Sequence, residues 1–187
     1  MAVTPNLIKC RSCKSDFEPV YRNGIILSRL CLSCLLRKAK DKVRKDKAKE
    51  RGGIKEKLKT HSQWLNDLQK VFNRYIRLRD KGKPCISCGC SLIGKYDAGH
   101  YFSVGAYPNI RFDEDNVHGQ CVACNQHRHG NTTEYSLSLP MRIGIDRYEK
   151  LLQIRNEPLK LSIEEIKEKI KYYKLKIKEY GNNSLKL

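Results

Sequence analysis

Residues 85–131 read CISCGCSLIGKYDAGHYFSVGAYPNIRFDEDNVHGQCVACNQHRHGN, and this stretch decides how the rest of the chain is interpreted. Two Cys-x-x-Cys pairs bracket it, Cys85/Cys88 and Cys121/Cys124. Each pair presents two sulfurs from one tight turn, a spacing typical of tetrahedral zinc sites. A zinc ion held by both pairs would pin two distant segments together. Polar side chains between the pairs then become the candidates for chemistry.

A second set of cysteine pairs near the N-terminus indicates another zinc site. Its members are Cys10, Cys13, Cys31 and Cys34. Between the pairs, the Asn23-Gly24 step favours a type I′ hairpin turn, and a helix is expected to start near Leu35. So short a segment buries little apolar surface, so zinc would supply much of its folding free energy. We interpret residues 1–36 as a structural zinc ribbon, with docking of DNA or protein as the alternative.

Eight of the nine cysteines fall into Cys-x-x-Cys pairs, which favours metal binding in a reducing cytoplasm over disulfides. No signal peptide is visible before the first pair. The ninth cysteine, Cys90, is interpreted as a buried or incidental thiol. Its alternative role is to replace Cys88 as a ligand.

The chain has 187 residues and a formal net charge of +18. Two four-cysteine zinc sites, each near −2, would still leave about +14. Such a charge is typical of nucleic-acid-binding proteins. A membrane surface is the competing partner, but no apolar run approaches a membrane span and no helix has a broad apolar face. We therefore expect DNA as the partner and no membrane.

Residues 37–59 hold twelve Lys or Arg against four Asp or Glu, a net charge of +8. Helix-forming residues dominate, and Gly52-Gly53 is expected to break any helix. The segment is either a solvated, partly helical linker or an arm that lies along DNA phosphates and releases counterions. The lysines proposed for phosphate contacts are Lys38, Lys42 and Lys45.

Residues 61–80 predict an amphipathic helix, because apolar residues recur at intervals of three and four. Thr60 or Ser62 can cap it, and Trp64 and Phe72 are expected in the core. Basic residues close to the second cysteine cluster are candidates for DNA contacts, with a solvated surface role as the alternative. They are Arg74, Arg77, Arg79, Lys83 and Arg111.

Within 85–131 we expect a strand or hairpin over 96–103, a short strand near 111–112, and a helix from about 121–124 onward. Asn125 and His129 are four apart and would share one face of that helix. A further helix is predicted over 141–156.

The last helix follows the Ser162–Glu165 capping box and should end at Gly181. Its apolar residues form a heptad seam. The seam packs either on its own domain or on a second subunit, so a homodimer is a candidate state.

The order His100, Asn116, Asn125 resembles the HNH (ββα-metal) nucleases, whose motif is a histidine, an asparagine, and a histidine or asparagine just after Cys-x-x-Cys. The resemblance implies that His100 is the general base, that Asn116 holds the loop orienting it, and that Asn125 binds a catalytic Mg²⁺ or Mn²⁺. His129 is a candidate helper. A treble-clef zinc module that only binds DNA is the alternative.

One position departs from the HNH pattern. Many of these enzymes carry an aspartate or histidine immediately before the base, where this chain has Gly99. Asp97 lies on the same strand face as Gly99, because alternate residues point the same way, and could supply the missing carboxylate. His118 is the other candidate, with a structural hydrogen bond as its alternative role.

Several strings together resemble the NinG family of lambdoid phages, also called Rap. They are FNRYIRLRD, CISC, DAGHYFSVGA, RFDEDNVHGQCVACN and the Gly130, Asn131, Tyr135 pattern. The likeness covers about residues 72–152, and more loosely the N-terminal pairs and basic run. It implies DNA recombination, structure-specific cleavage of branched substrates such as Holliday junctions and D-loops, and the cytoplasm of a bacterial host.

We therefore expect an α+β protein with two structural zinc ions and an HNH/treble-clef core. The expected parts are a zinc ribbon (1–36), a basic arm (37–59), a nuclease domain (60–156) and a C-terminal amphipathic helix (157–187). The expected activity is metal-dependent cleavage of branched DNA. A non-catalytic DNA-binding recombination accessory protein, and a sequence-specific homing or restriction nuclease, are the rival functions.

Overall fold

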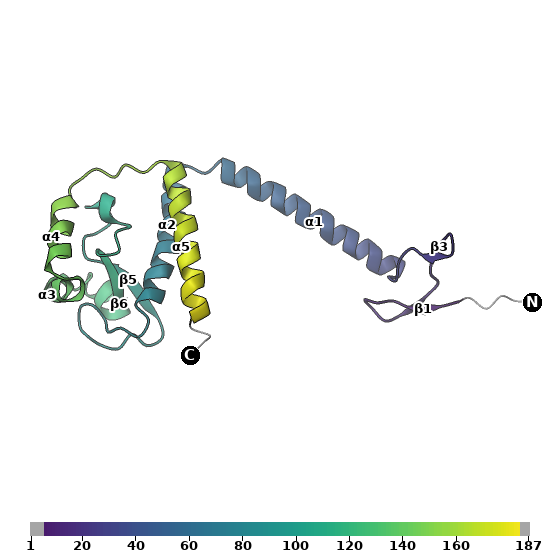
Figure 1. Ribbon diagram of the computed structural model, residues 1–187, viewed down its shortest axis with the longest axis horizontal. Helices are drawn as coiled ribbons and strands as arrows, with labels where there is room; N and C mark the ends of the chain where they lie inside the picture. The colour runs from purple at the N-terminus through teal and green to yellow at the C-terminus, as the bar shows by residue number, and fades with distance from the viewer. Residues whose placement is uncertain (1–5, 184–187) are drawn as a thin grey trace, which may run out of the picture. The chain divides into compact units, whose positions relative to one another are not determined.

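We describe the chain from a computed structural model that defines residues 6–183 (Figure 1). It is a mixed α and β structure, as predicted, built from helices and small antiparallel sheets. The chain divides into two compact units, residues 1–59 and 60–187, and each has its own buried core. No helix within the described residues is both long and apolar enough to cross a membrane.

The first unit begins with two short hairpins. The strand pairs are β1 (Ile8–Lys9) with β2 (Asp16–Phe17), and β3 (Tyr21–Arg22) with β4 (Ile25–Ile26). Asn23 and Gly24 join β3 to β4 with φ values of 51° and 75°. Two positive φ angles are what a type I′ turn requires, so the predicted turn is confirmed.

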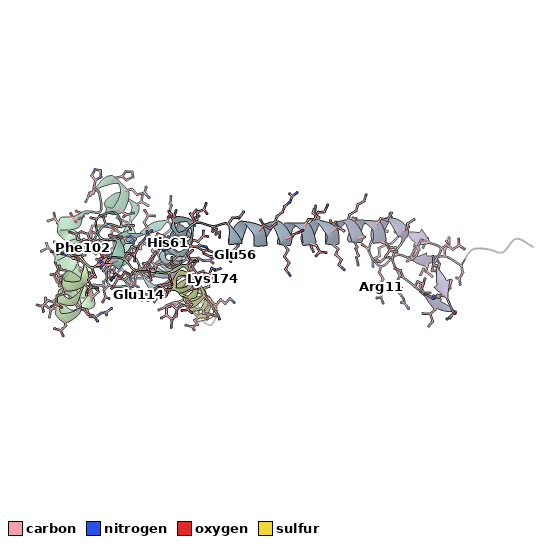
Figure 2. The ribbon with its side chains drawn as sticks, turned by 90° about the horizontal axis from the view of Figure 1, so that it is seen from above. Arg11, Glu56, His61, Phe102, Glu114 and Lys174 are labelled. Carbon is pink, nitrogen blue, oxygen red and sulfur yellow. The ribbon has the colours of Figure 1, made fainter. Side chains whose placement is uncertain are left out.

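One continuous helix, α1 (Leu32–Lys57), completes the first unit. The prediction that Gly52-Gly53 breaks the helix is wrong, because α1 runs through both residues. A glycine inside a helix costs only about 1 kcal/mol relative to alanine, and the surrounding Lys, Glu and Ala favour the helix. Apart from Cys34 and Asp41, the described side chains of α1 are exposed and project from it all around (Figure 2).

Two long helices form the frame of the second unit. α2 (His61–Arg79) starts with a capping box between Thr60 and Gln63, which confirms Thr60 as its cap. α5 (Ile163–Asn183) starts with the predicted box between Ser162 and Glu165. It continues through Gly181 instead of ending there, so that prediction is wrong. The two helices lie side by side (Figure 1).

The heptad seam of α5 packs against α2. Ile166, Ile170 and Tyr173 are buried in one core with residues of α2 and of the sheet beside it. The α2 residues of this core include Trp64 and Phe72, as predicted. This packing matches the first of the two alternatives, in which the seam packs on its own domain.

A two-stranded antiparallel sheet lies against α2. β5 (Tyr96–His100) pairs with β6 (Val117–Cys121), with Tyr96 opposite Cys121 and His100 opposite Val117. The predicted strand near 111–112 is wrong, since the chain there forms a short 3-10 helix, η1 (Pro108–Ile110), and a turn. Pro108 cannot donate to a strand ladder, and it starts the 3-10 helix instead.

A single π-helical turn, η2 (Ala123–His127), follows β6. Its end differs from the prediction, because the Gly130 N–H donates to the carbonyls of Cys124 and Asn125 and closes the turn. His129 lies beyond η2 with a φ of 47°. Asn125 and His129 therefore do not share a helical face.

Helices α3 (Thr132–Ile143) and α4 (Ile145–Ile154) enclose a second core with Ile86 and Ile110. The single helix predicted over 141–156 is wrong in extent. Gly144, at a φ of 89°, separates the two helices. α3 was not predicted, and it contains Pro140, a residue that usually argues against a helix interior.

Candidate metal centres and active site

The structure gathers eight cysteines into two clusters of four. The clusters are Cys10, Cys13, Cys31 and Cys34, and Cys85, Cys88, Cys121 and Cys124. Within each cluster the sulfur atoms lie within 4.8 Å of one another. Zinc–sulfur bonds of about 2.3 Å in a tetrahedron place sulfurs about 3.8 Å apart. The Cys13–Cys31 and Cys88–Cys121 sulfur separations are 3.6 and 3.8 Å, so both clusters suit zinc.

Backbone amides support the second cluster. The Cys121 N–H donates to the Cys85 sulfur, and the Cys124 N–H donates to the Cys121 sulfur, both at 3.4 Å. The backbone of Cys90 lowers the pKa of the Cys88 thiol to about 6. Such donors favour the thiolate, which is the form that binds metal. Cys90 itself lies outside the cluster and is exposed, so the interpretation of a buried thiol is wrong.

Asn116 is fully buried and ties down the loop that follows β5. Its Oδ1 accepts from the Phe102 N–H at 2.7 Å. Its Nδ2 donates to the carbonyls of Phe102 and Ile110, both at 3.1 Å. One side chain therefore fixes both ends of the loop 102–110, which leaves β5 directly after His100.

His100 is the last residue of β5, and its side chain faces α2. Its Nε2 lies 3.1 Å from the Arg111 carbonyl oxygen. A carbonyl can only accept, so this contact is a hydrogen bond in the tautomer that carries the proton on Nε2, which leaves the lone pair of the neutral ring on Nδ1. Burial, above all, lowers the pKa of His100 below its usual value of 6.5, and the nearby Arg111 charge adds to this. The ring is therefore neutral near pH 7.

Gln69 of α2 lies against His100 and is held by Asn73, and neither residue was singled out as a site candidate in the sequence. Gln69 of α2 accepts from Arg111 Nε at 3.1 Å and donates to Asn73 at 2.7 Å. Its Nε2 lies 3.5 Å from His100 Nε2, a packing contact without a hydrogen bond, because both nitrogens carry hydrogen in this tautomer. Arg111 is half-buried and stacks on Phe112. Glutamine and asparagine at a helical spacing of four gave no distinctive signal, because such residues are common on solvated helix faces.

Asp97 and Asn125 meet on the other face of the sheet. Asn125 Nδ2 donates to Asp97 Oδ2 at 3.0 Å, and Gln126 Nε2 donates to the same oxygen at 2.7 Å. Side chains of neighbouring strand residues point to opposite faces. The structure therefore brings Asp97 and Asn125 together, as expected, but places them on the opposite face of β5 from His100.

His118 and His129 do not join either group. His118 is buried, and its Nδ1 lies 3.2 Å from the Tyr135 hydroxyl, which donates to the Gly99 carbonyl. This matches the structural alternative for His118. His129 is exposed and lies beyond η2, so its candidate helper role has no structural support.

Some of the basic candidates are exposed, and others already bind groups within the chain. The proposal that Arg79 contacts DNA is not supported, because its guanidinium is nearly buried. It donates to Asp80 and to the carbonyls of Glu114 and Val117. Lys83 is half-exposed and pairs with Asp80 at 3.0 Å. The exposed candidates are Arg74, Lys38, Lys42 and Lys45, while Arg77 is half-buried.

Comparison with known proteins gives one consistent result. The model of the family described as Bacteriophage Lambda NinG protein matches residues 2–183. The Protein ninG of Escherichia phage lambda is 34% identical over 200 residues, which cover 98% of each chain. That of Escherichia phage 933W is 34% identical over 94% of each chain. That of Salmonella phage P22 is 36% identical over 76% of this chain and 78% of the relative. No solved structure matches the chain significantly.

Proposed function

Because the chain belongs to the NinG family of bacteriophage proteins, we propose that it is a metal-dependent DNA endonuclease of the HNH type. Its proposed substrates are branched recombination intermediates such as Holliday junctions and D-loops. One observation carries the proposal. A two-stranded hairpin and the short helix after it, clamped by four cysteines, carry His100, Asn116 and Asn125 in the order of the HNH motif.

His100 has the properties of a general base. A phosphodiester repels nucleophiles and has a poor leaving group, so hydrolysis needs a proton acceptor for the attacking water. The neutral ring can accept a proton at Nδ1 while the Arg111 carbonyl fixes Nε2. Asn116 then holds the loop that sets the position of the Arg111 segment against the ring.

Asp97 and Asn125 are the residues that would hold the catalytic cation. Their carboxylate and amide oxygens suit Mg²⁺ or Mn²⁺, which prefer oxygen ligands. Both side chains are half-buried and Asn125 Nδ2 donates to Asp97 Oδ2, and this proximity supports the assignment. When bound, the cation would stabilise charge on the scissile phosphate and its leaving oxygen.

Arg111 is a candidate contact for the scissile phosphate. Gln69 holds its Nε, and no carboxylate pairs with it among the ion pairs of the described residues. A half-buried guanidinium without an acidic partner is suited to an incoming phosphate. The exposed lysines of α1 offer further phosphate contacts, which would make binding depend strongly on salt.

A non-catalytic DNA-binding accessory function is the second candidate. It is favoured by the separation of His100 from Asp97 and Asn125 onto two faces of β5. The two residues Asp97 and His100 are three apart, about 10 Å along a strand. A nuclease must therefore bring a phosphate across the end of β5 to reach both groups.

A cleavage assay separates these functions. Labelled four-way junction and matched linear duplex are incubated with wild type, His100→Ala and His127→Ala, in Mg²⁺, in Mn²⁺ and with neither. His127 is an exposed histidine of η2 and serves as the matched control. We expect metal-dependent cutting of the junction only, reduced at least about 100-fold by His100→Ala and unchanged by His127→Ala. DNA binding and zinc content should stay intact.

Other outcomes have definite meanings. Equal cutting of junction and duplex would keep the nuclease but remove the preference for branches. A single cut site in linear duplex would favour a sequence-specific nuclease. Tight junction binding by all three proteins without cutting would overturn the nuclease and favour the accessory function.

A further inference from the structure

The side chain of Gln120 occupies the space where the HNH motif usually places a metal ligand. Gln120 is fully buried on β6, directly opposite Asp97 of β5. A Cβ built on Gly99 would lie 2.1 Å from Gln120 Oε1. Position 99 is where many HNH enzymes carry an aspartate or histidine. In this chain an amide oxygen from the partner strand fills that space instead.

The orientation of the Gln120 amide is fixed by its neighbours. Its nitrogen contacts the Gly130 carbonyl oxygen at 2.5 Å and the Ser87 hydroxyl at 2.7 Å. A carbonyl oxygen only accepts, so the atom facing Gly130 must be the nitrogen. Gln120 Oε1 therefore faces Gly99.

That oxygen is buried and has no hydrogen-bond partner. Burying an amide oxygen without a partner costs free energy on the order of 1–3 kcal/mol. Such an atom in a native structure calls for an explanation, and a bound water or ion is a common one. Asp97 is the cross-strand partner of Gln120 on the same sheet face, and Asn125 contacts Asp97.

We propose that Gln120 Oε1 is a ligand of the catalytic divalent cation, together with Asp97 and Asn125. Opposite residues of an antiparallel pair have Cβ atoms about 5 Å apart, so Gln120 and Asp97 are direct cross-strand neighbours. A carboxylate with two amide oxygens is a donor set suited to Mg²⁺ or Mn²⁺. Gly99 is then a requirement of the site, because any side chain there would displace the Gln120 oxygen.

This inference rests on the proposed nuclease site but is tested without cleavage. Mn²⁺ binding is titrated by electron paramagnetic resonance on the full chain with both cysteine clusters loaded with zinc. Wild type should bind one Mn²⁺ per chain beyond the zinc. Gln120→Leu should weaken that binding at least tenfold.

Two variants separate ligation from a structural role. Ser87→Ala removes one hydrogen-bond partner of the Gln120 nitrogen but leaves Oε1 in place, so it should change Mn²⁺ affinity less than threefold. Gly99→Ala keeps the Gln120 amide but puts a methyl group where Gln120 Oε1 lies, so it should weaken Mn²⁺ binding at least tenfold. If Gln120→Leu does not fold, the Gly99→Ala result decides: a folded Gly99→Ala that binds Mn²⁺ like wild type would overturn the proposal.

Folded Gln120→Leu that binds Mn²⁺ like wild type would also overturn it, as would a wild type that binds no Mn²⁺. If wild type binds Mn²⁺ through Gln120 but cuts no DNA, the cation site stands and the nuclease function fails. The two failures are therefore distinguishable.

Discussion

At the scale of single residues, His118 is a histidine that the fold keeps neutral. It is 3% exposed and lies between the Tyr135 hydroxyl and the cations Arg79, Arg142 and Lys83, with Asp80 as the opposing charge. Burial, with these cations, lowers its pKa to about 3. An unfolded chain would protonate the same residue near pH 6.5.

The sign of the resulting pH dependence follows from proton uptake. Above pH 6.5 the ring is neutral in both states and contributes no pH dependence. Between pH 6.5 and 3 only the unfolded state binds the proton, so the free energy of unfolding falls as the pH falls, by about 1.4 kcal/mol per unit. We expect His118→Gln to remove this slope.

Urea denaturation of wild type and His118→Gln at pH 5, 6 and 7, at the same zinc concentration, measures this pH dependence of the free energy of unfolding. Taking the difference between them cancels the effect of acid on the cysteine clusters. A difference that stays constant over this range would show that His118 titrates normally in the folded protein.

At the scale of elements, α5 stabilises the second unit by covering α2. Ile170 is buried in the shared core, whereas Leu175, on the same helix, is 49% exposed. Removing buried methyl groups costs transfer free energy and leaves a cavity. We expect Ile170→Ala to lower the free energy of unfolding by about 2–4 kcal/mol and Leu175→Ala by less than about 0.5 kcal/mol.

Urea denaturation of Ile170→Ala and Leu175→Ala tests this expectation, and sedimentation reports the association state of each. Equally small losses in the free energy of unfolding would mean that the seam of α5 is not buried within the chain. A concentration-dependent stability that Ile170→Ala abolishes would instead support the dimer contact.

The elements that the sequence predicted are those whose signals are local. The cap at Thr60, the capping box at Ser162 and the turn at Asn23-Gly24 need only neighbouring residues, and all three were confirmed. The shape of η2 depends on Cys124 reaching a cluster that includes Cys85 and Cys88, which are distant in sequence. That constraint has no local signature, so the helix end at His127 was missed.

The residues of the candidate site also fall into those that the sequence revealed and those that only the structure revealed. The motif residues and their order were visible in the sequence, and the contact between Asp97 and Asn125 was anticipated. Gln69 and Gln120 were not found, because their roles come from a helix packed on the sheet and from cross-strand register. Such neighbours become visible only once the pairing of β5 with β6 is known.

At the scale of the whole molecule, the two cysteine clusters lie in different units, Cys10 to Cys34 in the first and Cys85 to Cys124 in the second. The core of the first unit consists of its buried cysteines, with Phe17 and Leu30 packed against them. So small an apolar core cannot hold the unit without metal. The second unit has two larger cores in addition to its cluster.

We therefore expect Cys10→Ser to unfold the hairpins of the first unit and leave the second intact. Zinc content should fall from two to one per chain, and amides of β1–β4 should lose hydrogen-exchange protection while those of α2 and β5 keep theirs. Cys124→Ser is the matched variant, and it should spare the first unit and expose η2 and β6. Loss of protection across both units in either variant would contradict independent folding, because a defect confined to one zinc site can spread only if the units stabilise each other.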